Sequence, residues 1–480
     1  MGSDIGVYGL GVMGKNLAFN LADHGFTVAV YNRSKEKTEA LLEEKGALSI
    51  RGYTDVETFV THLNPPRRIF MMVQAGRATD DVIQSLLPYL SPGDVLIDGG
   101  NAYFHDTERR AKELELRGIH FLGLGISGGE TGARFGPSLM PGGSLRAYTS
   151  VAPMLEAIAA KYEDKPCVAY LGEGGAGHYV KMVHNGIEYA DMQLIAEVYH
   201  LLKHSLNASS DSLASIFDDW NQGELASYLI EITARILKVK DPESGEPLVD
   251  RILDRAQQKG TGKWTAQEAL ELGVPLSVIT EAVYARALSA MKEDRLRAAG
   301  ILAPAVLVEG SPEPSFAKEP VPKRDWIETL HEALYAAKII AYAQGFAQLK
   351  TAGEAYGWQL PLRDIASIWR AGCIIRARLL NDIMHVYADP AFQDHLLLAP
   401  LFAKRLKETI PHLRRAVRYG VEKGLPLPAL AQALSYYDGL RSAYLPANLI
   451  QAQRDFFGAH TYERTDRPGS FHTDWETFHP

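Results

Sequence analysis

A glycine-rich turn near the N-terminus limits the possible folds of this chain more than any other segment. The segment Gly9-Leu-Gly11-Val-Met-Gly14 follows the apolar run Ile5–Tyr8 and opens a helical pattern at Lys15–His24. A strand, glycines at this spacing and a helix form the fingerprint of a dinucleotide-binding unit. Gly9 permits the tight turn, Gly11 lets the backbone approach a pyrophosphate, and Gly14 allows close packing of helix on strand. An ordinary glycine-rich turn is the alternative.

Short apolar runs alternate with helical patterns through residues 1–175. This alternation is typical of βαβ units and a mainly parallel sheet, so we expect a Rossmann-like α/β domain here. The runs that we expect to form strands are Ile5–Tyr8, Thr27–Tyr31, Arg68–Val73, Val95–Asp98, His120–Leu124, Leu145–Thr149 and Cys167–Leu171.

The remainder of the chain is dominated by helical periodicity. A helical pattern without proline runs from Gly177 to about Ser205, and we expect a large all-α domain over residues 176–435. A loop rich in proline and glutamate, from Ala303 to Arg324, divides this domain. Trp220-Asn-Gln-Gly-Glu-Leu resembles Trp369-Arg-Ala-Gly-Cys-Ile. Two similar halves would explain this repeat, and so would chance similarity between two amphipathic helices.

The last segment, residues 436–480, forms a short C-terminal tail of different character. It contains three prolines and many aromatic residues, and it shows little periodicity. Such a tail is either disordered or, as its aromatic residues favour, packed against another surface.

Composition excludes several classes of protein. Of the 480 residues, 46% are apolar and 22% charged, and the net charge of −8 gives no overall basic field for nucleic acid or an anionic membrane. Cys167 and Cys373 form no CxxC pair, which favours a reducing compartment. The N-terminus lacks the pattern of a secretion signal, and no apolar run is long enough to span a bilayer. We therefore expect a cytoplasmic protein.

The end of the second expected strand indicates which dinucleotide binds. An NAD site usually has Asp or Glu there, which binds a ribose hydroxyl. This chain has Asn32, Arg33 and Ser34 instead. A guanidinium can pair with a 2′-phosphate and its two neighbours can add hydrogen bonds, so the sequence favours NADP over NAD. A solvated surface arginine is the alternative for Arg33.

Four polar residues form a stripe on the helical pattern that begins at Gly177. Lys181, His184, Asn185 and Glu188 occupy positions i, i+3, i+4 and i+7, so they share one helical face. Such a face is either solvated or lines a site, and spacing alone does not decide between the two.

The chemistry of these side chains favours a site. Oxidation of a hydroxyl by hydride transfer needs a base, and burial can lower the pKa of a lysine such as Lys181 enough for this role. The protonated lysine can then assist loss of CO2 from the β-keto acid, and a carboxyl such as Glu188 can protonate the carbon. The sequence has no HExxH or CxxC motif, so we expect no metal.

Longer motifs occur in order along the chain, at Gly9–Asn16, Asn32–Ser34, Asp98–Asn101, Gly125–Glu130, Gly177–Tyr189, Gln258–Thr265 and Arg454–Glu463. Together they resemble the 6-phosphogluconate dehydrogenase family over essentially the whole length. The resemblance implies oxidative decarboxylation of 6-phosphogluconate to ribulose 5-phosphate with reduction of NADP, a step of the pentose phosphate pathway. It also implies a homodimer.

The resemblance implies a role for each matched position. Lys181 is similar to the family's general base and then acid at the C3 oxygen, and Glu188 to the acid that protonates C1 of the enediol. The expected cofactor contacts are Gly9, Leu10, Gly11, Val12, Met13, Gly14, Asn32, Arg33, Ser34, Val73, Gln74, Ala75 and Asn101. The expected substrate contacts are Asn101, Ser127, Gly128, Gly129, His184, Asn185, Tyr189, Lys259, Thr261, Arg286, Arg454 and His460. In this family the last two come from the tail of the partner subunit.

Three positions depart from the family pattern. Gly11 stands where the family often has alanine, and glycine fits a pyrophosphate at least as well. Ser34 stands where threonine is commoner and keeps the hydroxyl. Gln74 stands where many members have a lysine beside the cofactor. Loss of that cation is expected to weaken NADP binding or the preference for NADP over NAD.

Two alternatives fit parts of the sequence. Another β-hydroxyacid dehydrogenase, acting on a smaller 3-hydroxy acid, would share the glycine motifs and the lysine. It would not need the cations Lys259, Arg286 and Arg454, or the additional helices and tail. A catalytically silent NADPH-binding sensor would have lost Lys181 or Glu188, and both are present.

Overall fold

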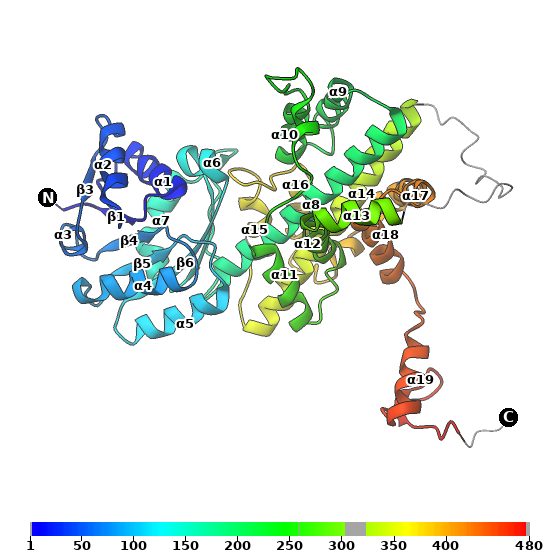
Figure 1. Cartoon of the computed structure of the whole chain (residues 1–480). Helices are drawn as coiled ribbons and strands as arrows, with labels where there is room; N and C mark the ends of the chain where they lie inside the picture. Colours follow the sequence, from blue (N-terminus) through cyan, green and yellow to red (C-terminus); the bar gives the residue numbers. More distant parts are fainter. Residues whose placement is uncertain (1, 259, 303–322, 477–480) are drawn as a thin grey trace. The chain divides into compact units, whose positions relative to one another are not determined.

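The computed structural model describes residues 2–258, 260–302 and 323–476 (Figure 1). The expected substrate contact Lys259 and nearly all of the expected loop Ala303–Arg324 lie outside the described residues.

The described residues of the first compact unit, Met1–Ala433, contain one seven-stranded sheet. Its strands are β1 (Ile5–Tyr8), β2 (Val28–Tyr31), β3 (Ile50–Tyr53), β4 (Arg68–Met71), β5 (Val95–Asp98), β6 (His120–Ser127) and β7 (Ser138–Gly143). The order is β3-β2-β1-β4-β5-β6-β7, and every neighbouring pair is parallel except β6 and β7. The order reverses between β1 and β4, where sheets of this type bind ligands at the carboxyl ends of their strands. This topology confirms the expected Rossmann-like domain.

Helices cover both faces of this sheet. They are α1 (Val12–Asp23), α2 (Lys35–Glu44), α3 (Val56–Thr61), α4 (Arg77–Leu86), α5 (Phe104–Glu115), α6 (Gly129–Phe135) and α7 (Leu145–Ile158), with a 3-10 turn η1 (Leu87–Tyr89) and a hairpin of β8 (Lys161–Tyr162) and β9 (Lys165–Pro166). Residues of α1, α2 and α7 are buried on one face with Val7 and Phe70. Residues of α3, α4 and α5 are buried on the other face with Ile69 and Met71. Successive side chains of a strand point to opposite faces, so each face has its own apolar core.

Two of the expected strands are wrong. Leu145–Thr149 forms the start of α7, whose N-terminus is capped by the hydroxyl of Ser144. The apolar residues that follow are buried at helical spacing, as in Val151 and Leu155, so the longer helical period prevails over the short apolar run. Cys167–Leu171 is not a regular strand, and Val168 makes only an isolated bridge to β7.

Two strands of the sheet, β3 and β7, were not predicted because neither contains a continuous run of apolar residues. In β3, at one edge of the sheet, only Ile50 is buried. In β7, at the opposite edge, Pro141 and two glycines interrupt the apolar run. Proline has no N–H to donate to a neighbouring strand, so within sheets it is largely restricted to edges.

The remainder of the first unit is helical, as expected. Its helices are α8 (Ala176–Leu206), α9 (Ser210–Trp220), α10 (Tyr228–Leu237), α11 (Thr261–Glu271), α12 (Ser277–Ala290), α13 (Lys292–Ile301), α14 (Lys323–Tyr356), α15 (Leu362–Ile368), α16 (Leu379–Val386), α17 (Pro400–Lys423) and the first part of α18 (Pro428–Leu440), which continues into the second unit, with 3-10 turns η2 (Leu248–Arg251) and η4 (Leu396–Leu398). The long helices α8 and α14 pack together and share a buried ion pair between Asp191 and Lys338, 2.6 Å apart. Among the described residues, none of the helices has the length and apolar character that a membrane span requires.

The two tryptophan segments lead into paired backbone. Trp220 ends α9 and Trp369 is the C-cap of α15, and each of these helices follows a long one. Shortly after them, Ser227 and Ala377 form an antiparallel bridge. This pairing agrees with the expectation that the helical domain consists of two similar halves. That expectation stays a prediction.

The second compact unit, Leu434–Pro480, includes α19 (Ala447–Gly458) and a hairpin of β10 (Tyr462–Glu463) and β11 (Ser470–Phe471). Its centre is the buried carboxylate of Asp455 on α19. This carboxylate accepts hydrogen bonds from the backbone N–H groups of Thr461 and Thr473 and from the side chains of His472 and Trp475. A polar centre of this kind leaves little apolar periodicity in the sequence.

Candidate active site

The glycine-rich turn joins β1 to α1, as the fingerprint predicts. Gly9 has a φ of +100°, and a Cβ there would lie 2.5 Å from the carbonyl oxygen of Met72. A Cβ on Gly14 would lie 1.9 Å from the carbonyl oxygen of Gly9, so α1 packs directly on the turn. A Cβ on Gly11 would meet no described atom within 4 Å. The turn is therefore closed at its two ends and open at the middle glycine.

The three residues after β2 lie beside this turn. The side-chain oxygen of Asn32 accepts a hydrogen bond of 2.9 Å from the backbone N–H of Leu10, and its amide donates to the carbonyl of Ser34 at 3.1 Å. Arg33 is exposed, so its guanidinium is accessible to a solute. Asn32 thus ties the loop after β2 to the glycine-rich turn, and Arg33 places a positive charge at the surface beside them.

Two further loops meet at the same edge of the sheet. Val73, Gln74 and Ala75 follow β4, and Asn101 follows β5. The carbonyl oxygen of Val73 lies 3.1 Å from the position that a Cβ on Gly100 would take, so the two loops are in contact. Gln74 and Asn101 are exposed. The expected cofactor contacts therefore gather at the carboxyl ends of β1, β2, β4 and β5.

Three residues of the polar stripe on α8 are buried and Glu188 is partly buried, with 22% of its side chain exposed, so the solvated-face alternative is wrong. Lys181, His184 and Asn185 are 6%, 0% and 7% exposed. The imidazole of His184 has a polar group near each nitrogen. Its Nε2 lies 3.2 Å from the hydroxyl of Ser127, and its Nδ1 lies 3.2 Å from the side-chain oxygen of Asn185. The nearest carboxylate oxygen of Glu188 is 3.9 Å from the same Nδ1.

Two glycines allow close packing around α8, Gly125 on the face of the stripe and Gly186 on another face of the helix. A Cβ on Gly125 of β6 would lie 2.5 Å from the Cβ of Lys181. A Cβ on Gly186 of α8 would lie 2.6 Å from Thr265 of α11, whose hydroxyl donates to the carbonyl of Met182 at 2.8 Å. Neither glycine was predicted to have a role, although glycine inside a strand or helix is a signal of close backbone approach.

Burial shifts the titration of the stripe in opposite directions. Burial lowers the pKa of Lys181, and the negative charges of Glu188 and Cys373 offset only part of this effect. Burial raises the pKa of Glu188, against the opposing charges of Lys181 and Arg286. The pKa of His184 falls well below its ordinary value because of burial and the charge of Lys181. The pKa shifts of Lys181 and Glu188 both favour the neutral form of the group. A neutral lysine can accept a proton, and a neutral carboxyl can donate one.

A cation lies at the far end of the stripe. The guanidinium carbon of Arg286, on α12, is 3.4 Å from the ring centre of Tyr189, the residue after Glu188. A Cβ on Gly262 would lie 2.6 Å from the same tyrosine ring, so the start of α11, with the buried Thr261, is close by. The structure thus brings together three of the expected phosphate and hydroxyl contacts.

The loop after β6 lies at the other side of His184. Ser127 is the last residue of β6 and is buried, and Gly128 and Gly129 follow with φ values of +112° and +62°. A Cβ on Gly128 would lie 2.5 Å from the carbonyl oxygen of Gly372. Glycine is therefore required at position 128 by both its conformation and its neighbour.

Residues far along the chain complete the surroundings of the stripe. The ring of Trp369 lies 5.5 Å from that of His184. Cys373 is fully buried, and burial raises its pKa to about 12, although the charge of Lys181 lowers it. No motif in the sequence indicated that these two residues would reach α8.

Arg454 and His460 belong to the second unit. Arg454 lies on α19, where its guanidinium donates to the side-chain oxygen of Gln451 at 3.0 Å, and His460 follows the end of this helix. Both side chains are exposed. Within the described residues of the whole chain, no group of three or more His, Cys, Asp or Glu side chains is placed to hold a metal ion.

Comparisons with known proteins cover almost the whole chain. A family model described as the NAD binding domain of 6-phosphogluconate dehydrogenase matches residues 4–172, and one described as the C-terminal domain of 6-phosphogluconate dehydrogenase matches residues 177–475. Two decarboxylating 6-phosphogluconate dehydrogenases of Bacillus subtilis are similar over their full length. The NADP(+)-dependent one is 55% identical, covering 98% of each chain, and the NAD(+)-dependent one is 53% identical, covering 99% of this chain and 100% of its own.

A solved structure has the same fold. Plasmodium falciparum 6-phosphogluconate dehydrogenase, described in its apo form and in complexes with NADP+ and with 6-phosphogluconate, matches with a TM-score of 0.93 and 44% identity. The match covers 98% of this chain and 100% of that chain.

Proposed function

The chain belongs to the 6-phosphogluconate dehydrogenase family, and we propose that it oxidatively decarboxylates 6-phospho-D-gluconate to D-ribulose 5-phosphate and CO2, with reduction of NADP to NADPH. The observation that carries this proposal is the buried stripe on α8. It holds a lysine of lowered pKa and a carboxyl of raised pKa, Lys181 and Glu188, seven residues apart on one face.

Lys181 acts twice in the proposed reaction. Its neutral amine accepts the proton of the C3 hydroxyl while a hydride leaves C3 for the nicotinamide, which is the chemistry that the cofactor supplies when bound. The resulting ammonium donates its proton to the C3 ketone oxygen as the bond to the carboxylate breaks and CO2 leaves. The electron pair of that bond forms the enediol. Glu188 then protonates the carbon that lost CO2, which becomes C1 of the product.

We propose NADP rather than NAD as the cofactor. Arg33 supports this choice because it is exposed at the end of β2, where a 2′-phosphate would lie, and no carboxylate stands at positions 32–34. The relatives include an NADP(+)-dependent and an NAD(+)-dependent enzyme at nearly equal identity, so overall similarity does not select the cofactor. Gln74, in place of the family's lysine, limits the preference.

The substrate contacts extend the proposal to a homodimer. We propose that Ser127, Gly128 and Gly129 hold the carboxylate, that Asn101, His184 and Asn185 contact the substrate, and that Tyr189, Lys259, Thr261 and Arg286 bind its phosphate end. Arg454 and His460 would come from the partner subunit. We propose that the enzyme is cytoplasmic.

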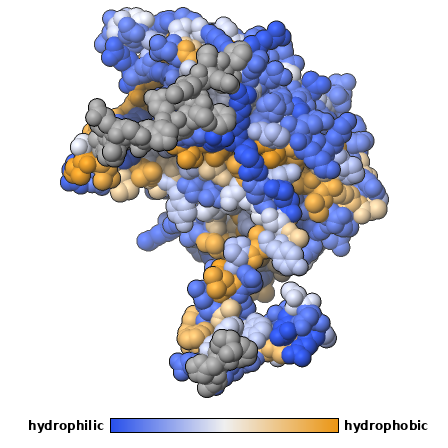
Figure 2. All heavy atoms as spheres, turned by 90° about the vertical axis from the view of Figure 1, so that its right-hand side faces the viewer, coloured by the Kyte–Doolittle hydropathy of each residue, from blue (hydrophilic) through white to orange (hydrophobic). Residues whose placement is uncertain are grey.

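Apolar surface supports the proposed homodimer, because the helical part and the second unit both expose apolar patches, which are orange in Figure 2. Large exposed apolar residues include Leu288, Met291, Leu296 and Ile301 near α12 and α13, and Leu449, Ile450, Phe456 and Phe457 on α19.

The proposed reaction is tested by the absorbance of reduced nicotinamide on adding 6-phosphogluconate, with NADP and NAD in parallel and no added metal. Rapid reduction of NADP with release of a pentulose phosphate is expected. If folded, dimeric protein reduces neither cofactor, the substrate is wrong, and smaller 3-hydroxy acids become the next candidates.

A shared active site is tested by mixing two inactive variants. Lys181→Met and Arg454→Ala each disable every site of their own dimer. In a mixed dimer, one site combines both changes and the other has neither, so unfolding and refolding the two variants together restores activity. If the mixture stays inactive although mixed dimers form, Arg454 does not act across the interface.

A further inference from the structure

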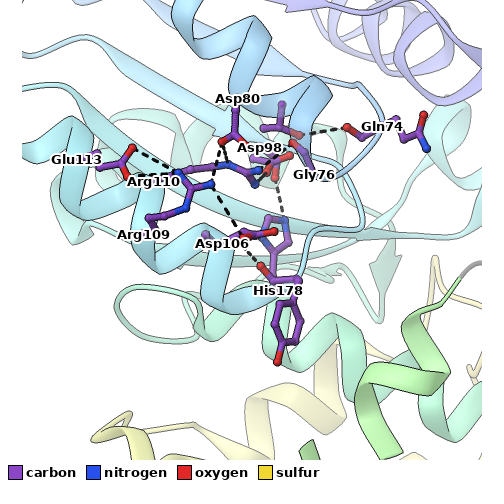
Figure 3. Close-up of polar contacts among 12 residues, drawn as sticks. Gln74, Gly76, Asp80, Asp98, Asp106, Arg109, Arg110, Glu113 and His178 are labelled. Carbon is purple, nitrogen blue, oxygen red and sulfur yellow. Dashed lines mark hydrogen bonds and ion pairs between the residues drawn. The ribbon is translucent and has the colours of Figure 1, made fainter. Parts of the chain in front are cut away.

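The guanidinium of Arg110, on α5, lies beneath the loop that follows β4 (Figure 3). Its side chain is 1% exposed. Nε donates to a carboxylate oxygen of Asp80 at 2.7 Å, and Nη2 donates to the carbonyl of Gly76 at 2.9 Å. Nη1 lies 3.7 Å from Oδ2 of the buried Asp98. One buried cation therefore faces both the start of α4 and the end of β5.

These contacts flank the two loops that are expected to touch the cofactor. Gly76 directly follows Val73–Ala75 and is the N-cap of α4. Asp98 precedes the other loop, and its Oδ1 accepts a hydrogen bond of 3.0 Å from the N–H of Gly100. Asp98 thus shapes its own loop with one oxygen and faces Arg110 with the other.

Helix α5 also contacts the helix that carries Lys181. One turn before Arg110, the hydroxyl of Thr107 lies 2.7 Å from Nδ1 of His178, and Nε2 of His178 lies 3.1 Å from the carbonyl oxygen of Asp98. In Figure 3, Asp98 contacts both Arg110 and His178. Since His178 is three residues before Lys181 on α8, continuous contacts lead from the β4 loop to the proposed base.

The neighbouring Arg109 provides a contrast. Its guanidinium also bonds to Asp80, at 3.0 Å, but its other ion-pair partners are Asp106 and Glu113 on its own helix, and its side chain is 45% exposed. Ion pairs of this kind contribute little because water screens them. A buried guanidinium costs free energy unless its hydrogen-bond partners compensate. A general need for charge at the surface therefore does not explain why an arginine is buried at position 110.

We propose that Arg110 is a positioning residue, which holds the loops at Val73–Ala75 and Asp98–Asn101 in place against α8. Through them it sets the distance between the nicotinamide and the substrate carbon beside Lys181. This inference rests on the proposed function. Hydride transfer is sensitive to such placement, because a shift of about 1 Å from a distant change can cost roughly 100-fold in rate.

The test compares Arg110→Met with Arg110→Lys and with the matched control Arg109→Met. Steady-state kinetics give kcat and the KM values for NADP and for 6-phosphogluconate, and a fluorescence titration measures NADPH binding without substrate. We expect Arg110→Met to lower kcat/KM for NADP roughly 100-fold. The KM for 6-phosphogluconate should stay near the wild-type value, because its proposed contacts lie mainly on other elements. Arg110→Lys should recover part of the loss, and Arg109→Met should match the wild type.

A second variant covers the case in which Arg110→Met does not fold. Asp80→Asn removes the carboxylate that holds Arg110, at a side chain that is 36% exposed. It should show the same pattern at smaller size, a lower kcat/KM for NADP with an unchanged KM for 6-phosphogluconate. The proposal is overturned if the Arg110 and Asp80 variants keep the wild-type kcat/KM for NADP, if Arg109→Met loses as much, or if both KM values rise together. A wild type without turnover overturns the proposed function instead. The role of Arg110 in holding the two loops is then tested by the NADPH titration, in which Arg110→Met should bind NADPH more weakly than Arg109→Met, and equal affinities would overturn it.

Discussion

Gly125 lies so close to Lys181 that a Cβ at position 125 would be 2.5 Å from the Cβ of the lysine. Strand β6 therefore shields this side of Lys181 from water, and burial lowers the pKa of the amine. Burial raises the pKa of Glu188 on the same helical face. One packing arrangement thus shifts both the proposed base and the proposed acid toward their neutral forms.

Replacing Lys181 should separate catalysis from cofactor binding. Lys181→Met keeps the length and the apolar stem of the side chain but removes the amine. We expect kcat to fall roughly 10²- to 10⁴-fold, the usual contribution of a general acid–base group. NADPH binding, measured by fluorescence titration, should persist because the expected dinucleotide contacts lie at the ends of β1, β2, β4 and β5. Retention of wild-type turnover would show that the base is another residue.

The two pKa shifts predict a bell-shaped pH profile for kcat/KM. Lys181 must be neutral to accept a proton, so activity is lost as pH falls through its lowered pKa. Glu188 must be protonated to act as an acid, so activity is lost as pH rises through its raised pKa. Because the two groups interact, the apparent pKa values belong to the pair.

Glu188→Gln tests the assignment of the acid. The amide keeps the size of the side chain but does not titrate, so the variant should be slow and its pH profile should keep only one of the two limbs. A profile that keeps both limbs would remove Glu188 from the proposed mechanism.

The choice of cofactor should depend on Arg33. Arg33→Ala removes the cation that we propose for the 2′-phosphate, and a charge-assisted hydrogen bond contributes about 1.5–3 kcal/mol. We expect kcat/KM for NADP to fall roughly 10- to 100-fold. The value for NAD, which has no 2′-phosphate, should hardly change and serves as the internal control. A parallel fall with both cofactors would mean that Arg33 supports the fold of the turn instead.

The glycine turn makes a prediction about stability. In Gly14→Ala the new Cβ would lie 1.9 Å from a backbone oxygen, and overpacking of this kind typically lowers the free energy of unfolding by roughly 1–3 kcal/mol. Gly11→Ala adds the same methyl group where no described atom lies within 4 Å, so its effect should stay within about 0.5 kcal/mol. Denaturant unfolding measures both variants. Equal destabilisation would contradict the open geometry at Gly11.

The second unit should lose stability in acid. Burial alone would raise the pKa of Asp455, but hydrogen bonds from His472, Thr473 and others lower it to about 2, below its ordinary value of 3.8. The stabilisation is therefore complete above about pH 4 and is lost as pH falls toward 2.

Hydrogen exchange provides the measurement at neutral pH. In Asp455→Asn the backbone N–H groups of Thr461 and Thr473 should exchange faster. The control is Asp466→Asn, which removes an exposed carboxylate paired with Arg464 at 2.7 Å in the same unit and should leave both rates unchanged. Similar rates in the two variants would show that Asp455 does not organise this unit.

Features with local and regular spacing were predictable. The turn at Gly9–Gly14 was predicted from a strand, a helix and three glycines. At Gly9 and Gly14 a Cβ would collide with backbone oxygen atoms, as the fingerprint requires. The stripe from Lys181 to Glu188 follows from helical geometry alone. The strand expected at Leu145–Thr149 failed because a five-residue apolar run suits a buried strand or one turn of a buried helix, and only the longer pattern through α7 separates them.

The family, the Rossmann-like fold and the residues that share the proposed catalytic face were predictable from the amino-acid sequence, because these depend on motifs and on the period of one helix. The burial of that face was not predictable, because it depends on contacts with distant segments. Gly125 and Trp369, from segments far apart in the chain, lie against the stripe. The pKa shifts of Lys181 and Glu188 depend on this burial, because a charge loses its solvation only when the folded chain excludes water from it. The contacts of Arg110 with the β4 loop and Asp98 likewise exist only in the folded chain.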